Sequence, residues 1–118
     1  MNDTNRSEEL CEDLSPLTFH NNINSLNKDD IVIIDVRTPD EYKSGHIRGA
    51  INIDYYNKNF LSVITQMDPL LIYFIYCRRG NRSMKTLEMM RAKGYLHLHQ
   101  MLGGIDSWVR CELPLTKE

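Results

Sequence analysis

Two short runs of apolar residues, Ile31–Val36 and Leu70–Tyr76, constrain the fold more than any other feature of the chain. Neither run alternates polar and apolar residues, so each has the pattern of a strand that is covered on both faces. Stretches with helical spacing accompany them, such as Phe19, Ile23 and Leu26 at positions i, i+4 and i+7. Strands that alternate with helices in this way predict a small α/β domain with a parallel sheet.

Local signals predict the remaining elements. Thr38, Pro39 and Glu41 form the pattern of a capping box with proline at the first helical position, and Gly45 ends this short helix. Another helix is expected to begin at Ser15 and Pro16. Further strands are expected at residues 51–53 and 96–102, and further helices over the apolar stripes 60–67, 84–90 and 105–108.

The 118 residues of the chain have the length of one domain. Residues 1–15 contain few side chains to bury, so we expect a flexible N-terminal leader there and the folded domain in residues 16–118. The first residues have neither the basic nor the apolar region of a targeting signal. The longest apolar run is also far shorter than the ~20 residues that cross a bilayer.

Charge and cysteine content narrow the class of protein. The net charge of −2 argues against a chain that binds nucleic acid or an anionic membrane. Three cysteines, Cys11, Cys77 and Cys111, make a poor disulfide framework, which favours a reduced protein in the cytoplasm. Cys11 and Cys111 lie in segments without features that would activate a thiol, and we expect both to be inert.

Cys77 lies in a different environment, because it closes the second apolar run and a helix begins shortly after it. Ligands of parallel sheets bind beyond the carboxyl ends of the strands, and a helix N-terminus favours an anion. Arg78, Arg79 and Arg82 lie within five residues of the sulfur. Gly80 permits a tight turn that points successive N–H groups at one place. A structural thiol would need none of these features, so we expect Cys77 to be a thiolate nucleophile at neutral pH.

Residues 77–83 also resemble the active loop of the single-domain rhodanese sulfurtransferases, C-[R/K]-x-G-x-R-[S/T], at every position. The stretch that contains Asp35-Val36-Arg37, Glu41-Tyr42 and residues 45–50 is similar to the family's D-V-R…E-[Y/F]…G-H-I-P-G-A signature. Arg48 stands there in place of the usual proline. Leu102-Gly103-Gly104-Ile105 with Trp108 is similar to the closing L-x-G-G-x-x-x-W, so the resemblance covers roughly residues 17–115.

The resemblance implies a rhodanese-like α/β fold with about five mainly parallel strands and helices on both faces. It also implies that the Cys77 thiolate takes the outer sulfur of a small anionic donor such as thiosulfate and carries it as a persulfide. A thiophilic acceptor, such as cyanide, a small thiol or a protein cysteine, would then remove the sulfur. No cofactor is implied beyond this covalent intermediate.

The residues of the loop have separate roles in this interpretation. Cys77 and Arg82 are the expected catalytic residues, with Arg82 bracing the loop beside Cys77, while Arg78 and Arg79 point outward and attract the donor. Backbone amides would hold the persulfide anion. The expected substrate-binding residues of the loop are Arg78, Arg79, Gly80, Asn81 and Ser83.

Residues outside the loop are expected to support the site. Asp35 and Arg37 are expected to form a buried ion pair rather than to touch the substrate. His46 is expected to make a structural hydrogen bond, since a thiolate that is already formed needs no general base. Gly103 and Gly104 are expected to allow a close approach of two backbone segments near the pocket.

Three other kinds of function are alternatives for a domain with this loop. Cysteine phosphatases and arsenate reductases of related architecture have a Cys-x5-Arg loop, whereas this chain has the shorter Cys-x4-Arg, which suits a single sulfur atom better. A non-catalytic binding module is a further alternative, although such domains typically lose the cysteine. A carrier that accepts a persulfide from one protein and gives it to another would keep every residue. No set of side chains has the spacing of metal ligands, so we expect no metal.

Overall fold

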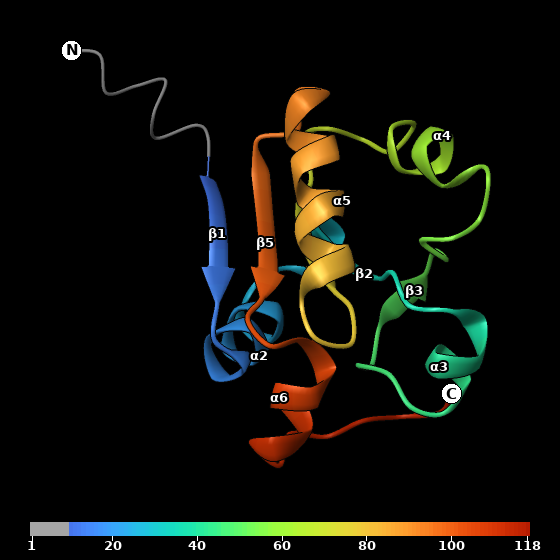
Figure 1. Cartoon of the computed structure of the whole chain (residues 1–118). Coiled ribbons are helices and arrows are strands. Elements are labelled where there is room, and N and C mark those ends of the chain that lie inside the picture. The colour runs from blue at the N-terminus through green and yellow to red at the C-terminus, as the bar shows by residue number, and fades with distance from the viewer. Residues whose placement is uncertain (1–9) are drawn as a thin grey trace.

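The computed structural model describes residues 10–118, which form a parallel five-stranded sheet between two layers of helices (Figure 1). Every pair of neighbouring strands in this sheet is parallel. The order of the strands across the sheet is β1 (Leu10–Leu14), β5 (His97–Met101), β4 (Ile72–Tyr76), β2 (Ile31–Asp35) and β3 (Ala50–Asn52). The two apolar runs thus form β2 and β4 at the centre, as their composition predicts.

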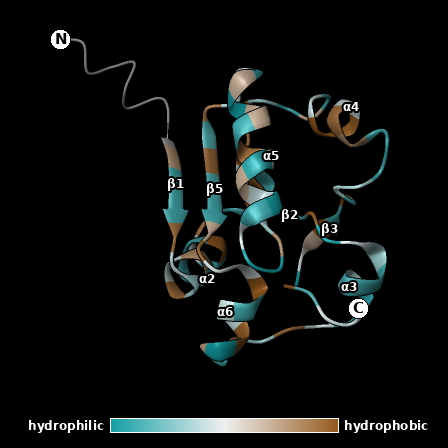
Figure 2. Cartoon of the chain, viewed as in Figure 1, coloured by the Kyte–Doolittle hydropathy of each residue, from teal (hydrophilic) through white to brown (hydrophobic). Residues whose placement is uncertain are grey.

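Helices cover both faces of the sheet, as predicted. On one face, α2 and α6 pack Phe19 and Trp108 against Phe74 and Tyr76. On the other face, α4 and α5 bury apolar side chains against the opposite sides of β2 and β4. Figure 2 shows both hydrophilic and hydrophobic residues along α5 and α6, as expected for helices with one buried side. The helices are α2 (Pro16–Ser25), α3 (Pro39–Lys43), α4 (Phe60–Ile64), α5 (Asn81–Ala92) and α6 (Gly104–Arg110), and a short 3₁₀ helix covers Lys28–Asp30.

The N-terminal boundary of the domain differs from the prediction. Residues 10–14, expected in a flexible leader, form the edge strand β1 and pair in parallel with β5. Figure 2 shows that the carboxyl-terminal half of β1 is largely hydrophilic, and among the side chains of residues 11–14 only that of Leu14 is buried. Backbone pairing with β5 stabilises an edge strand without an apolar run, which is why composition did not reveal it. The expectation for residues 1–9 lies outside the described part of the chain.

The start of α3 agrees with the sequence prediction, whereas the end of α4 differs from it. α3 begins with the predicted capping box, in which the Thr38 hydroxyl accepts from the Glu41 amide and the Glu41 carboxylate accepts from the Thr38 amide. α4 ends at Ile64, earlier than the predicted apolar stripe. Beyond this end, the hydroxyl of Tyr95 donates a hydrogen bond of 2.6 Å to the carbonyl of Met67.

No helix within residues 10–118 has the length and apolar character needed to cross a membrane.

Candidate active site

Cys77 directly follows β4 at the carboxyl end of the sheet, and its side chain is only 1% exposed. The chain turns sharply after it, and α5 begins at Asn81. Gly80 makes this turn possible with a φ of 110°, a value in the left-handed region that favours glycine. The sulfur therefore lies under the N-terminus of a twelve-residue helix, where backbone N–H groups are free of intrahelical partners.

Backbone amides of the loop converge on the Cys77 sulfur. The Gly80 amide donates to Sγ at 3.0 Å and the Ser83 amide at 3.4 Å. The Ser83 hydroxyl lies 3.4 Å from Sγ. A cavity of about 150 Å³ opens above the sulfur, and it is lined by Cys77, Arg78, Arg79, Asn81 and Arg82. This arrangement can hold a small anion against the thiol group.

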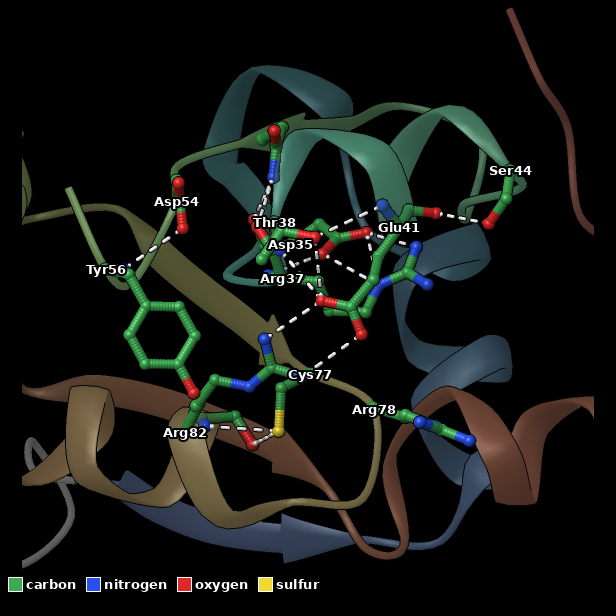
Figure 3. A network of polar contacts seen from close by, with 12 residues as sticks. Asp35, Arg37, Thr38, Glu41, Ser44, Asp54, Tyr56, Cys77, Arg78 and Arg82 are labelled. Atoms are coloured by element: carbon green, nitrogen blue, oxygen red, sulfur yellow. Dashed lines mark hydrogen bonds and ion pairs between the residues drawn. The ribbon is translucent and has the colours of Figure 1, made fainter.

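Arg82 is held by a residue that the sequence interpretation assigned only to a helix cap. Its guanidinium donates to both carboxylate oxygens of Glu41, at 3.0 and 3.3 Å (Figure 3). Burial alone would raise the pKa of Glu41, but hydrogen bonds from Arg82 and Thr38 outweigh it and lower the pKa to about 2. The same pair raises the pKa of Arg82. Arg82 therefore braces the loop through α3, and its guanidinium also lies over the Tyr56 ring at 5.7 Å.

Replacing Glu41 by glutamine is expected to lower the free energy of unfolding at pH 7 by about 1–2 kcal/mol, because Arg82 loses its charged partner. The pKa of Glu41 is lowered from 4.5 to about 2 in the folded state, so this stabilisation is complete above pH 4.5. It is lost as the pH falls towards 2. Urea denaturation at several pH values should thus show a difference between wild type and variant that shrinks in acid.

The matched control is Asp40→Asn, which removes a charge from the same helical turn at an exposed position. It should change stability by a few tenths of a kcal/mol at most. A Glu41→Gln variant as stable as Asp40→Asn at pH 7 would show that the Glu41–Arg82 pair does not brace the loop.

Asp35 and Arg37 form a buried pair at the end of β2. The Arg37 side chain donates to both Asp35 oxygens, with the shortest contact 2.7 Å, and to the carbonyl of Gly45 at 2.7 Å. Burial lowers the pKa of Arg37, but the hydrogen bond to Asp35 and its negative charge outweigh this and raise it. Neither residue lines the cavity over Cys77, so the structure places the pair in the scaffold beside the site.

His46 is engaged away from the sulfur. Its Nδ1 lies 2.9 Å from the carbonyl of Tyr42 and its Nε2 lies 3.2 Å from that of Glu118. The ring stacks on Tyr42 with 3.7 Å between centroids. These contacts join α3 to the end of the described chain, and they give His46 a structural position.

Gly103 and Gly104 bring α6 against the active loop. The amides of Ile105 and Asp106 donate to the carbonyls of Cys77 and Arg78, at 2.9 and 3.1 Å. A Cβ atom at position 104 would lie 2.3 Å from the Arg78 carbonyl oxygen, so only glycine fits there. This backbone contact holds the first residues of the active loop against the N-terminus of α6.

The two outer arginines differ from Arg82 in exposure. The Arg78 and Arg79 side chains are 57% and 70% exposed, and Figure 3 shows Arg78 pointing away from the sulfur. Both lie near the Asp106 carboxylate, at 3.6 and 3.5 Å. At such exposure the pairs are weak, so both guanidinium groups remain available to an anion.

The contacts of Glu41 and of Gln100 were not found by sequence reasoning. Gln100 accepts a hydrogen bond of 2.7 Å from the Ser83 hydroxyl at the back of the site. The capping box alone explained a glutamate at position 41, so nothing in the sequence pointed to a contact between Glu41 and Arg82. Gln100 had no signal beyond being a polar residue in a predicted strand.

The fold and the site together define a class of α/β domain that carries a cysteine at the end of a central strand, in a loop whose amides donate to its sulfur. The family model of the rhodanese-like domain matches residues 18–111, and the chain belongs to this family.

Individual relatives agree with this assignment. Thiosulfate sulfurtransferase 16, chloroplastic, of Arabidopsis thaliana is 31% identical over 94 residues, which cover 69% of this chain and 76% of that protein. Thiosulfate sulfurtransferase GlpE of Pseudomonas entomophila is 27% identical over 84 residues, which cover 71% of this chain and 75% of that protein. The crystal structure of a rhodanese-related protein from Thermoplasma volcanium superposes with a TM-score of 0.77 at 26% identity, and covers 91% of this chain and 99% of that one.

Proposed function

We propose that this protein is a thiosulfate sulfurtransferase that moves sulfane sulfur from an anionic donor to a thiophilic acceptor through a persulfide on Cys77. The observation that carries the proposal is the convergence of the Gly80 and Ser83 amides on Sγ, under a small cavity lined by arginines. Relatives named as thiosulfate sulfurtransferases support the same reaction class. A cytoplasmic location and the absence of a cofactor belong to this proposal.

The first half-reaction loads the cysteine. The Cys77 thiolate attacks the outer sulfur of thiosulfate, a new S–S bond forms, and the bond to the sulfonate sulfur breaks with its electron pair leaving on sulfite. Amides that already point at Sγ would stabilise the thiolate, and the N–H groups at the start of α5 would be available to the terminal sulfur of the persulfide. Arg78 and Arg79, at the rim of the cavity, attract the doubly charged donor.

The second half-reaction removes the sulfur from the Cys77 persulfide. Cyanide, a small thiol or a protein cysteine attacks the terminal sulfur, and the electron pair of the S–S bond returns to Sγ as the thiolate. The two half-reactions share one site, so the kinetics should follow a ping-pong scheme. A persulfide carrier between proteins would use the same two steps.

The experiment that tests this function is the formation of thiocyanate from thiosulfate and cyanide by the purified protein. Turnover with parallel double-reciprocal lines is the expected result, and hydrolysis of an aryl phosphate should stay at the buffer rate. The opposite pattern, aryl phosphate hydrolysis without thiocyanate, would favour a phosphatase. A protein that forms no thiocyanate yet gains sulfur from a protein persulfide would be a carrier.

A further inference from the structure

A chain of polar contacts runs from Cys77 to the edge of the sheet. The Ser83 hydroxyl lies 3.4 Å from Sγ and 2.7 Å from Oε1 of Gln100. On its other side, Nε2 of Gln100 donates to Asp13 at 2.9 Å. Ser83 and Gln100 are almost fully buried, at 0% and 1% exposure, whereas Asp13 is exposed on β1. Asp13 and Gln100 are also direct partners in the pairing of β1 with β5.

Donor and acceptor chemistry fixes the direction of every hydrogen bond in this chain. An ionised carboxylate only accepts, so Asp13 requires the NH₂ group of Gln100 on its side. The amide oxygen of Gln100 then faces Ser83, and it too can only accept. The single hydroxyl proton of Ser83 is therefore committed to Gln100. The carbonyl of Gly80, at 3.2 Å, is the weaker competitor for that proton because it is farther away.

This direction leaves no hydroxyl proton for the Cys77 sulfur. A thiol can donate its own proton to the Ser83 oxygen across the 3.4 Å contact. A thiolate at this position faces the lone pairs of the Ser83 oxygen, which is unfavourable. If the Ser83 hydroxyl instead rotates to donate to the thiolate, the Gln100 oxygen is left buried and unpaired. The inner sulfur of a persulfide needs no such proton, because its negative charge sits on the terminal sulfur.

We propose that Gln100, held by Asp13 of β1, is a positioning residue that withholds the Ser83 proton from Cys77 and so destabilises the free thiolate. The N-terminal strand then takes part in the chemistry of the site. The same bias favours the loaded persulfide over the unloaded thiolate, and this second consequence rests on the proposed sulfurtransferase function.

The test variants should leave the other titratable and charged groups around Cys77 unchanged. These are Arg78, Arg79 and Arg82 of the loop and α5, Asp35 at the end of β2 and Arg37 just after it, Glu41 of α3, Asp106 of α6, Tyr76 of β4 and His99 of β5. The informative variants change only Asp13 or the uncharged Gln100. Asp13→Ala breaks the contact to Gln100 at an exposed position, and Asp13→Asn removes the charge but keeps an acceptor oxygen.

The measurement is the rate of Cys77 alkylation by iodoacetamide against pH, with Cys11 and Cys111 distinguished by peptide mass. In Gln100→Met and Asp13→Ala, Ser83 can donate to the thiolate, so the midpoint of the profile should move to lower pH by about 0.5–1 unit. The plateau rate should fall about twofold, since a stabilised thiolate is a weaker nucleophile. Asp13→Asn should keep the wild-type midpoint.

The matched control is Glu12→Gln, which removes a charge from the adjacent position of β1. Glu12 lies beside His99 rather than Gln100 and should leave the profile unchanged. Equal shifts in Asp13→Ala and Asp13→Asn would assign the effect to charge and overturn the proposal, as would a Gln100→Met profile that matches wild type. Should Gln100→Met fail to fold, Asp13→Ala decides the question alone.

Alkylation requires no sulfur donor, so this result stands whether or not the protein transfers sulfur. A separate experiment addresses the loaded state, in which persulfide prepared with thiosulfate is titrated with sulfite. The sulfite concentration that discharges half of the persulfide should be about fivefold lower for Asp13→Ala than for wild type, because the thiolate product of the variant is more stable. Equal sulfite dependence in the two proteins would overturn the second consequence.

Discussion

Replacing Cys77 by serine should lower thiocyanate formation from thiosulfate and cyanide at least about 1,000-fold, to the rate without enzyme. A serine hydroxyl is not ionised at neutral pH, and an oxygen cannot hold the sulfane sulfur as a persulfide. The fold should survive, because serine is close to cysteine in size and the loop is also held by α6 and by Glu41. Continuous measurement of thiocyanate on both proteins, with circular dichroism as the check on folding, provides the comparison.

Cys111→Ser is the matched control for this variant. Cys111 is exposed and follows α6, away from the cavity over Cys77. Its replacement should leave the rate of thiocyanate formation unchanged. Activity that survives Cys77→Ser, or activity lost with Cys111→Ser, would show that the sulfur is carried elsewhere.

Replacing Asp35 by alanine should cause the largest loss of stability, about 3–5 kcal/mol in the free energy of unfolding. Asp35 and Arg37 have side chains that are 0% and 5% exposed, so the variant leaves a buried guanidinium without its counter-ion. It also removes the acceptor of the Arg37 backbone amide, which donates to Asp35 at 2.9 Å. Urea denaturation at pH 7 measures this loss directly.

A double variant tests whether the stability lost in Asp35→Ala comes from the unpaired charge of Arg37. Asp35→Leu combined with Arg37→Met replaces both charges with apolar side chains and should recover much of the stability lost in Asp35→Ala. Asp29→Ala, at an exposed position, should cost no more than about 0.5 kcal/mol. A loss below about 1 kcal/mol for Asp35→Ala would mean that the buried pair is not a main support of the site.

Sequence reasoning predicted the central sheet because its signals are local. The β-branched run at Ile31–Asp35 can only be stable between two layers, and the capping box of Thr38 and Glu41 marks a helix start by itself. The position of Cys77 follows from the same logic, since a strand, a glycine turn and a helix are adjacent in the chain.

Contacts between distant segments were not predictable in the same way. Glu41 meets Arg82 and Asp13 meets Gln100 only after the sheet has formed, and each residue has an adequate local explanation without its partner. β1 has the composition of a loose segment, and its stability comes from backbone pairing with β5. The supports of the site therefore required the structure, although the nucleophile did not.

The most direct test of the central claim, that sulfur is carried on Cys77, is the intact mass of the protein after treatment with thiosulfate and removal of small molecules. The protein should gain the mass of one sulfur atom, peptide mapping should place it on Cys77, and cyanide should remove it. A protein that gains no sulfur from thiosulfate, or one that gains it on Cys11 or Cys111, would contradict the persulfide mechanism.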